Sequence, residues 1–73
     1  MNYNTAISLL NKTVHFTATC ELFPHNGICG RVIDVTYAKN GEVILTVMVS
    51  HRRVTIGGNT RGLAFSTISP DTV

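Results

Sequence analysis

The chain has 73 residues, of which 44% are hydrophobic and 14% charged, and its formal net charge at pH 7 is +2. This length allows a single domain spanning residues 1–73 and leaves no room for a second, while the apolar content excludes a disordered tail. The small positive charge excludes the dense basic stripe of a strong duplex binder.

The N-terminal segment predicts a short helix. Asn4 or Thr5 can cap it, and Asn11 can end it in the left-handed conformation. The apolar residues between them lie near one face, which we expect to cover one end of a barrel. No apolar run has the length of a signal peptide or of a membrane span, which needs about 20 residues. We therefore expect an intracellular protein with no membrane partner.

Five strand-like runs follow this helix. Residues 14–22 alternate between apolar and polar side chains, which is typical of a half-buried strand. A turn at 24–27 and a loop at 57–60 interrupt the later runs. We expect the remaining strands at 28–37, 42–49, 52–56 and 63–68, with Ser69-Pro70 ending the last. Five short strands with tight turns predict a small barrel.

The dipeptide Asn40-Gly41 predicts a two-residue type I′ turn, because both residues accept a positive φ. The register that this turn sets puts residues 43, 45, 47 and 49 of the third strand on one face of the hairpin. Residues 44, 46 and 48 lie on the other face, together with their partners in the second strand. Both faces of this hairpin would be apolar, so barrel closure or a contact between subunits must cover one of them. The predicted register pairs Tyr37 with Ile44, Val35 with Thr46 and Ile33 with Met48.

Three short motifs are spread along the chain. Residues 9–14 form a Leu-rich helix end that runs into a Lys-x-Val strand start. Gly30 lies in the second strand, with Val32 two residues later and Asn40 ten residues later, before an apolar run. Arg61-Gly62 opens the fifth strand and Ser69-Pro70 follows it. Together the motifs resemble those of the Sm and Sm-like (LSm, Hfq-related) family.

The resemblance implies an all-β fold, namely a small, strongly bent, five-stranded SH3-type barrel preceded by a short helix. It also implies a cyclic homo-oligomer in which the fourth strand of one copy pairs with the fifth strand of the next. Two open sheet edges favour such a closed ring, for which we expect five to seven subunits. Thr36, Thr60 and Leu63 depart from the family pattern, which affects the nucleotide pocket and not the fold.

The family binds single-stranded, often uridine-rich RNA at the inner rim of the ring, where the loops at 37–41 and 57–62 would lie. Tyr37 or Arg61 would stack on bases, Asn40 would bond a base edge, and Lys39 would meet phosphate. The competing interpretation is that Asn40-Gly41 is only a turn and that Tyr37 packs against Ile44. The RNA-binding candidates are Tyr37, Lys39, Asn40, Arg61 and Gly62.

The segment His51-Arg52-Arg53 is a basic cluster. It is a candidate secondary patch for phosphates on the outer face of the ring. The competing interpretation is a strand start whose charges discourage aggregation.

The chain offers little for metal or enzyme chemistry. His15, Cys20, His25 and Cys29 do not follow a recognised zinc-ligand spacing, and we expect no metal site and no cofactor. We expect Cys20 to be a small core residue and both cysteines to be reduced. No nucleophile has a base and an orienting group at a suggestive spacing, so we expect no enzyme. Two alternatives to an RNA-binding ring stay open: a structural or protein-interaction ring, and a monomeric barrel such as an oligonucleotide-binding fold.

Overall fold

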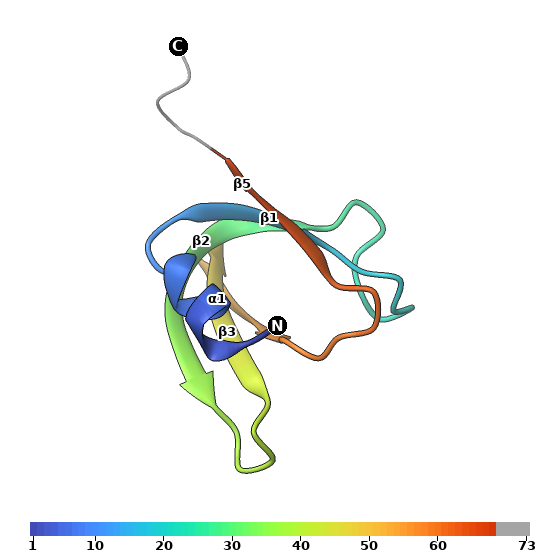
Figure 1. Cartoon of the computed structure of the whole chain (residues 1–73). Helices are drawn as coiled ribbons and strands as arrows, with labels where there is room; N and C mark the ends of the chain where they lie inside the picture. The colour runs from blue at the N-terminus through green and yellow to red at the C-terminus, as the bar shows by residue number, and fades with distance from the viewer. Residues whose placement is uncertain (69–73) are drawn as a thin grey trace.

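The computed structural model describes residues 1–68 as one five-stranded antiparallel sheet with one short helix (Figure 1). The all-β prediction is therefore confirmed, whereas Ser69-Pro70 lies outside the described residues. Within residues 1–68, no helix has the length and apolar character that crossing a membrane requires. The elements are α1 (Tyr3–Ser8), β1 (Thr13–Thr17), β2 (Ile28–Tyr37), β3 (Val43–Val49), β4 (Arg52–Gly57) and β5 (Ala64–Ile68).

Helix α1 begins earlier than predicted. Its N-cap is Asn2, whose Oδ1 accepts a hydrogen bond from the Thr5 backbone N–H at 2.8 Å, so neither Asn4 nor Thr5 is the cap. An asparagine three residues before a free N–H is well placed for this bond. Asn11 has the predicted left-handed conformation, with φ of 66°. The helix buries Ala6 against the core of the sheet.

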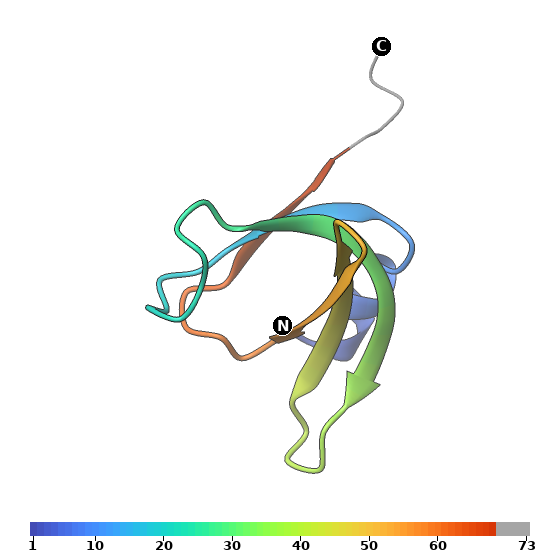
Figure 2. The ribbon, with the colours of Figure 1, turned by 180° about the vertical axis from the view of Figure 1, so that it is seen from behind.

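The strands follow the order β4-β3-β2-β1-β5. Strands β4 and β5 are the two ends of this order and do not pair with each other, so the sheet of a single chain is not closed. Figures 1 and 2 show a strongly curved sheet, with β2 bent along its length and with the β4 and β5 ribbons separated from each other. Each of these two strands therefore keeps one edge with unpaired backbone groups.

The turn between β2 and β3 differs from the prediction by one residue. The Gly41 N–H donates to the Ala38 carbonyl at 3.0 Å, and the Ala38 N–H donates to the Glu42 carbonyl at 2.8 Å. Gly41 has a φ of 84° and Asn40 does not have a positive φ, so the loop has three residues and ends in a glycine bulge. Tyr37 consequently pairs with Val43, and the predicted partner Ile44 pairs with Thr36.

The two faces of the sheet differ more in their apolar character than the predicted register implied. A bulge between Val32 and Asp34 leaves Ile33 without a partner and keeps Val35 on the core face, opposite Leu45. The other face of the sheet, called the outer face below, carries mostly polar side chains from β1 to β4. The expectation of two apolar faces is therefore wrong. The buried core consists of Ala6, Leu9, Val14, Phe16, Val32, Val43, Leu45, Val47 and Ile56.

Strand β1 ends at Thr17, five residues before the predicted end. The chain turns away here because the Thr19 N–H donates to the Arg61 carbonyl at 3.2 Å and the Phe23 N–H donates to the Cys20 carbonyl at 3.0 Å. Cys20 is half-buried in this β1–β2 loop and is not a core residue. Leu22 in the same loop is 94% exposed.

Candidate nucleic-acid interface

The predicted loop residues of the β2–β3 turn lie at its tip, at the bottom of Figure 1. Lys39 and Asn40 are both exposed there. The Asn40 Oδ1 accepts a hydrogen bond from the Glu42 N–H at 2.9 Å, so the side chain stabilises the turn. Lys39 is the residue of this turn that presents a positive charge to solvent.

An aromatic pair adjoins this turn. Tyr37, the last residue of β2, is 60% exposed and stacks on Tyr3 of α1, with ring centroids 4.7 Å apart and the planes 13° from parallel. The stack fixes the Tyr37 ring and leaves part of it open to solvent. The sequence-based interpretation missed Tyr3, because its partner is set by the docking of the helix and not by any spacing in the chain.

The β4–β5 loop holds Arg61 and Gly62 through contacts with the β1–β2 loop. The Arg61 carbonyl accepts hydrogen bonds from both the N–H and the hydroxyl of Thr19, at 3.2 and 3.1 Å. Gly62 has a φ of 67°, and a Cβ at this position would collide with the Thr19 hydroxyl. Gly62 is therefore required for this close approach, whereas Arg61 contributes only its backbone carbonyl to it.

The two predicted RNA loops touch at their bases and diverge at their tips. The Gly58 N–H donates to the Val43 carbonyl at 2.7 Å, which joins the end of β4 to the start of β3. Arg61, however, lies beside residues 19–22 of the β1–β2 loop. The structure thus groups Tyr37, Lys39 and Asn40 at one turn and places Arg61 and Gly62 at another.

The predicted basic patch is divided between the two faces of the sheet. Ser50 and His51 form the two-residue turn between β3 and β4, and both have positive φ, 47° and 71°. Arg52 pairs with Val49 and Arg53 with Met48, so consecutive arginines point to opposite faces. All three patch residues are exposed, but only Arg53 belongs to the outer face.

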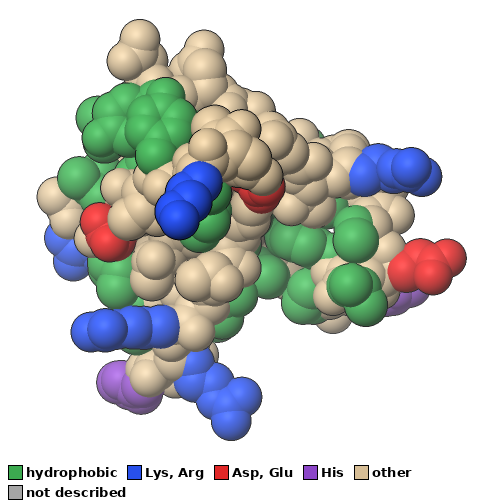
Figure 3. All heavy atoms as spheres, turned by 90° about the horizontal axis from the view of Figure 1, so that it is seen from below, with side chains coloured by type: hydrophobic (Ala, Val, Ile, Leu, Met, Phe, Trp, Pro, Cys, Tyr) green, Lys and Arg blue, Asp and Glu red, His purple; other side chains and the backbone are tan. Residues whose placement is uncertain are grey.

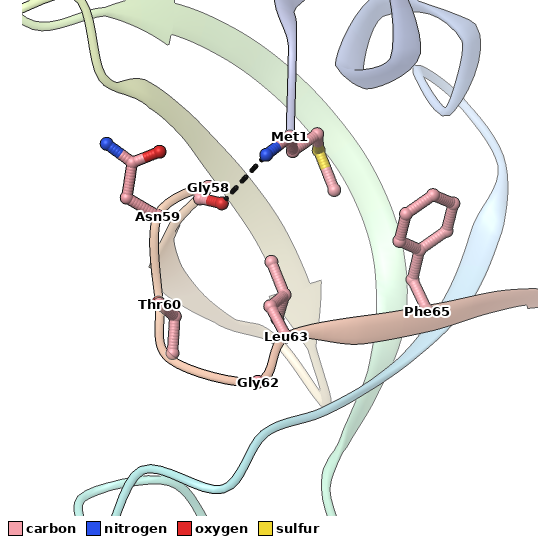
Figure 4. A pocket seen from close by; sticks show the side chains of 7 residues that line it. All are labelled: Met1, Gly58, Asn59, Thr60, Gly62, Leu63 and Phe65. Carbon is pink, nitrogen blue, oxygen red and sulfur yellow. Dashed lines mark hydrogen bonds between the residues drawn. The ribbon is translucent and has the colours of Figure 1, made fainter.

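A hollow of about 400 Å³ lies between the chain start, the β4–β5 loop and the beginning of β5. Figure 4 shows Met1, Leu63 and Phe65 pointing toward one another across it, whereas Asn59 points away. The Met1 amino group donates to the Gly58 carbonyl at 3.1 Å and so holds the chain start against the β4–β5 loop. The hollow therefore combines three apolar side chains with the polar β4–β5 loop, beside the unpaired edge of β5.

The histidine and cysteine residues do not converge. The His15 ring Nε2 lies 3.1 Å from the Asn26 carbonyl oxygen, and Cys20 and Cys29 are both free thiols. Within residues 1–68, no group of three or more His, Cys, Asp or Glu side chains is arranged to hold a metal ion.

Positive side chains are dispersed over the face of the molecule seen from below (Figure 3). Seen from below in Figure 3, the Lys and Arg side chains lie at several separate places, and hydrophobic side chains gather on a projecting lobe at the right. A duplex-binding stripe is not present on this face, which agrees with the low net charge.

The comparisons with known proteins leave the family open. No family model, no curated protein and no solved structure matches the chain.

Proposed function

We propose that the chain is the subunit of an Sm-like homo-oligomeric ring of five to seven copies that binds single-stranded RNA. The observation that carries this proposal is the pair of unpaired edges, β4 and β5, at the two ends of one bent antiparallel sheet. Pairing β4 of one copy with β5 of the next would satisfy both edges. Repetition of such a head-to-tail contact gives a closed ring when the rotation closes.

The bend of the sheet supports the SH3-type arrangement within this proposal. β2 is bent along its length (Figure 1) and contains the bulge at Ile33, and bulges increase the twist and bend of a strand. At Gly30, a Cβ would collide with the Met48 carbonyl oxygen, so the close approach of β2 to β3 at this point requires glycine. Gly30 is also the glycine of the motif that resembles the Sm family.

Apolar side chains beside the open edge of β5 also favour a neighbouring subunit. Phe65 and Ile68 are 41% and 42% exposed, and the hollow beside Phe65 is lined by Met1 and Leu63. Val54 of β4 is half-buried and faces the same core side. A paired β4 from the next copy would bring its Val54 over this recess and remove the apolar surface from water.

The turn at residues 37–41 supplies the groups that suit an unpaired base and its phosphate. The Tyr37 ring, held by Tyr3, offers a stacking surface, and such stacking contributes about 1–3 kcal/mol per base. Lys39 supplies a positive charge at the same turn, and Arg61 supplies one from the β4–β5 loop. The mechanism is non-covalent, because repetition around a ring multiplies these modest contacts into salt-sensitive capture of one strand.

Two measurements on the whole chain test the proposal. Native mass spectrometry should give a mass of five to seven subunits, and a monomer at high concentration would contradict the ring. Labelled oligouridine should bind saturably, and more weakly as salt rises. Arg61→Ala should weaken this binding, whereas Lys12→Ala, which removes one exposed charge far from both loops in sequence, serves as the charge-matched control. Oligouridine that fails to bind at low salt would contradict the RNA function.

One observation favours a second candidate, a ring that binds a protein and no nucleic acid. Leu22 is 94% exposed in the β1–β2 loop, beside a hollow lined by Phe23, Ile28 and Val54. An apolar knob next to an apolar recess is typical of protein interfaces. A ring mass without oligouridine binding would favour this candidate.

A further inference from the structure

The strand register gathers two arginines that are far apart in the sequence. Arg31 of β2 pairs with Met48 of β3, and Met48 pairs with Arg53 of β4, so the three residues form one row across the sheet. Thr13 of β1 extends this row as the other partner of Arg31. Residues directly opposite one another on neighbouring strands share a face, and this is the outer face of the sheet.

We infer that the outer-face row Thr13, Arg31, Met48 and Arg53 binds the phosphate backbone of single-stranded RNA. This inference rests on the proposed function for its ligand but concerns a surface separate from the two RNA loops. It assigns a role to Arg31, which sequence motifs did not single out, and it separates Arg53 from its neighbour Arg52.

The accessibility of the row suits a phosphate chain. Both arginines are exposed, and two strand spacings of about 4.8 Å separate their backbones. Their guanidinium groups can therefore reach neighbouring phosphates of one strand, each through paired N–H donors. Thr13 and Met48 are half-buried between and beside them, which leaves the arginines as the groups that project.

The next row of the same face adds hydroxyl groups and one negative charge. Asp34 pairs with Thr46, and Thr46 pairs with Thr55. Threonine hydroxyls donate to phosphate oxygens in many nucleic-acid complexes. Asp34 is the one acidic residue within the described strands, and its Oδ1 accepts the Val35 N–H at 2.9 Å. The Glu42 carboxylate also lies on this face, against Gly57 at the end of β4, so the two arginines of the row, and not the net charge of the face, supply the attraction for phosphate.

Adjacent arginines of β4 provide a matched pair of variants. Arg53→Ala removes a charge from the outer face, and Arg52→Ala removes the same charge one residue away on the opposite face. Fluorescence anisotropy with short labelled oligouridine, between about 50 and 200 mM salt, measures the affinity and its salt slope. Circular dichroism confirms that each variant, including the double variant Arg31→Ala/Arg53→Ala, is folded.

We expect the double variant to bind at least about tenfold more weakly at low salt, with a slope smaller by about 1.4, or about 0.7 for each phosphate contact. Arg53→Ala should lose about half of that slope, Arg53→Lys should keep it, and Arg52→Ala should change it little. Equal effects of Arg52→Ala and Arg53→Ala would overturn the inference, because general charge would then explain both. An unchanged double variant together with a weakened Arg61→Ala would also overturn it while leaving the proposed function intact. Failure of the unaltered protein to bind oligouridine would overturn both.

Discussion

The hairpins on the two sides of β3 are built differently. The β3–β4 hairpin has a two-residue turn, Ser50-His51, and an unbroken register of six pairs from Ile44–Gly57 to Val49–Arg52. The β2–β3 hairpin has a three-residue loop that ends at Gly41 and a bulge at Ile33. The regular hairpin ends in an unpaired edge, while the irregular one bends the sheet.

The difference shows that burial outweighs local turn preference. Asn40-Gly41 has the stronger preference for a type I′ turn, but that turn would place Val35 opposite Thr46. The observed loop is one residue longer and puts Val35 opposite Leu45, on the core face. A shift of one residue moves every side chain of a strand to the other face, so the apolar pattern determines the register and the turn adapts.

The largest expected effect on stability comes from adding a side chain at Gly30, where β2 closely approaches β3 in the irregular hairpin. Gly30→Val introduces a Cβ that collides with the Met48 carbonyl oxygen, a backbone atom that cannot move without breaking the register. We expect the free energy of unfolding to fall by about 3 kcal/mol or more, which is much of the stability of so small a domain. Urea denaturation followed by circular dichroism measures this loss.

The matched variant in the regular hairpin is Thr55→Val, at an exposed position of β4. We expect its unfolding free energy to stay within about 0.5 kcal/mol of that of the unaltered protein. A Gly30→Val protein that is as stable as Thr55→Val would show that the close approach of β2 to β3 tolerates a side chain and that the bend of β2 does not depend on Gly30.

A smaller effect is expected at the glycine of the three-residue loop. Gly41 has a φ of 84°, and no heavy atom lies within 4 Å of a Cβ built on it. Gly41→Ala should therefore cost only the backbone strain of the left-handed conformation, about 1 kcal/mol, measured as a lower urea midpoint. Gly41→Asn is the control, because asparagine tolerates this conformation and should lose less. Equal losses for the two variants would contradict the assigned turn geometry.

The sequence was sufficient to predict the strands but not the loops and turns that connect them. Alternation and β-branched residues predicted all five strands, and β2 has the predicted bounds, Ile28–Tyr37. The prediction extended β1 to residue 22 because the alternation continues there, whereas a hydrogen bond from Thr19 to Arg61 redirects the chain. That contact joins residues 42 positions apart, and no local pattern reports it.

The candidate sites differ in the same way, because some depend on proximity in the sequence and others on how the strands pair. The turn residues Lys39 and Asn40 lie together as their proximity in the sequence requires. Arg52 and Arg53 are also adjacent in the sequence, but strand geometry sends them to opposite faces. Arg31 joins Arg53 only through two strand registers, and the predicted register paired Met48 with Ile33, two residues from its observed partner Arg31. Surface clusters on a sheet depend on register, so sequence neighbours alone do not define them.

The smallest expected effect tests the two turns directly with the same replacement. His51 has a φ of 71° in the β3–β4 turn, which costs a residue with a Cβ about 1–2 kcal/mol, whereas Lys39 in the β2–β3 turn does not have a positive φ. His51→Gly removes that strain but adds the entropy that glycine loses on folding, about 0.5–1 kcal/mol. We expect a net gain of about 0.5 kcal/mol, seen as a melting temperature about 2–4 °C higher.

Lys39→Gly brings the same entropic cost with no strain to relieve, so its melting temperature should fall. The opposite signs follow only if His51 is left-handed and Lys39 is not, as observed. A lower melting temperature for both variants would mean that His51 is not left-handed and that Ser50-His51 is not a type I′ turn. The register between β3 and β4, and with it the pairing of Met48 with Arg53 in the row, would then change.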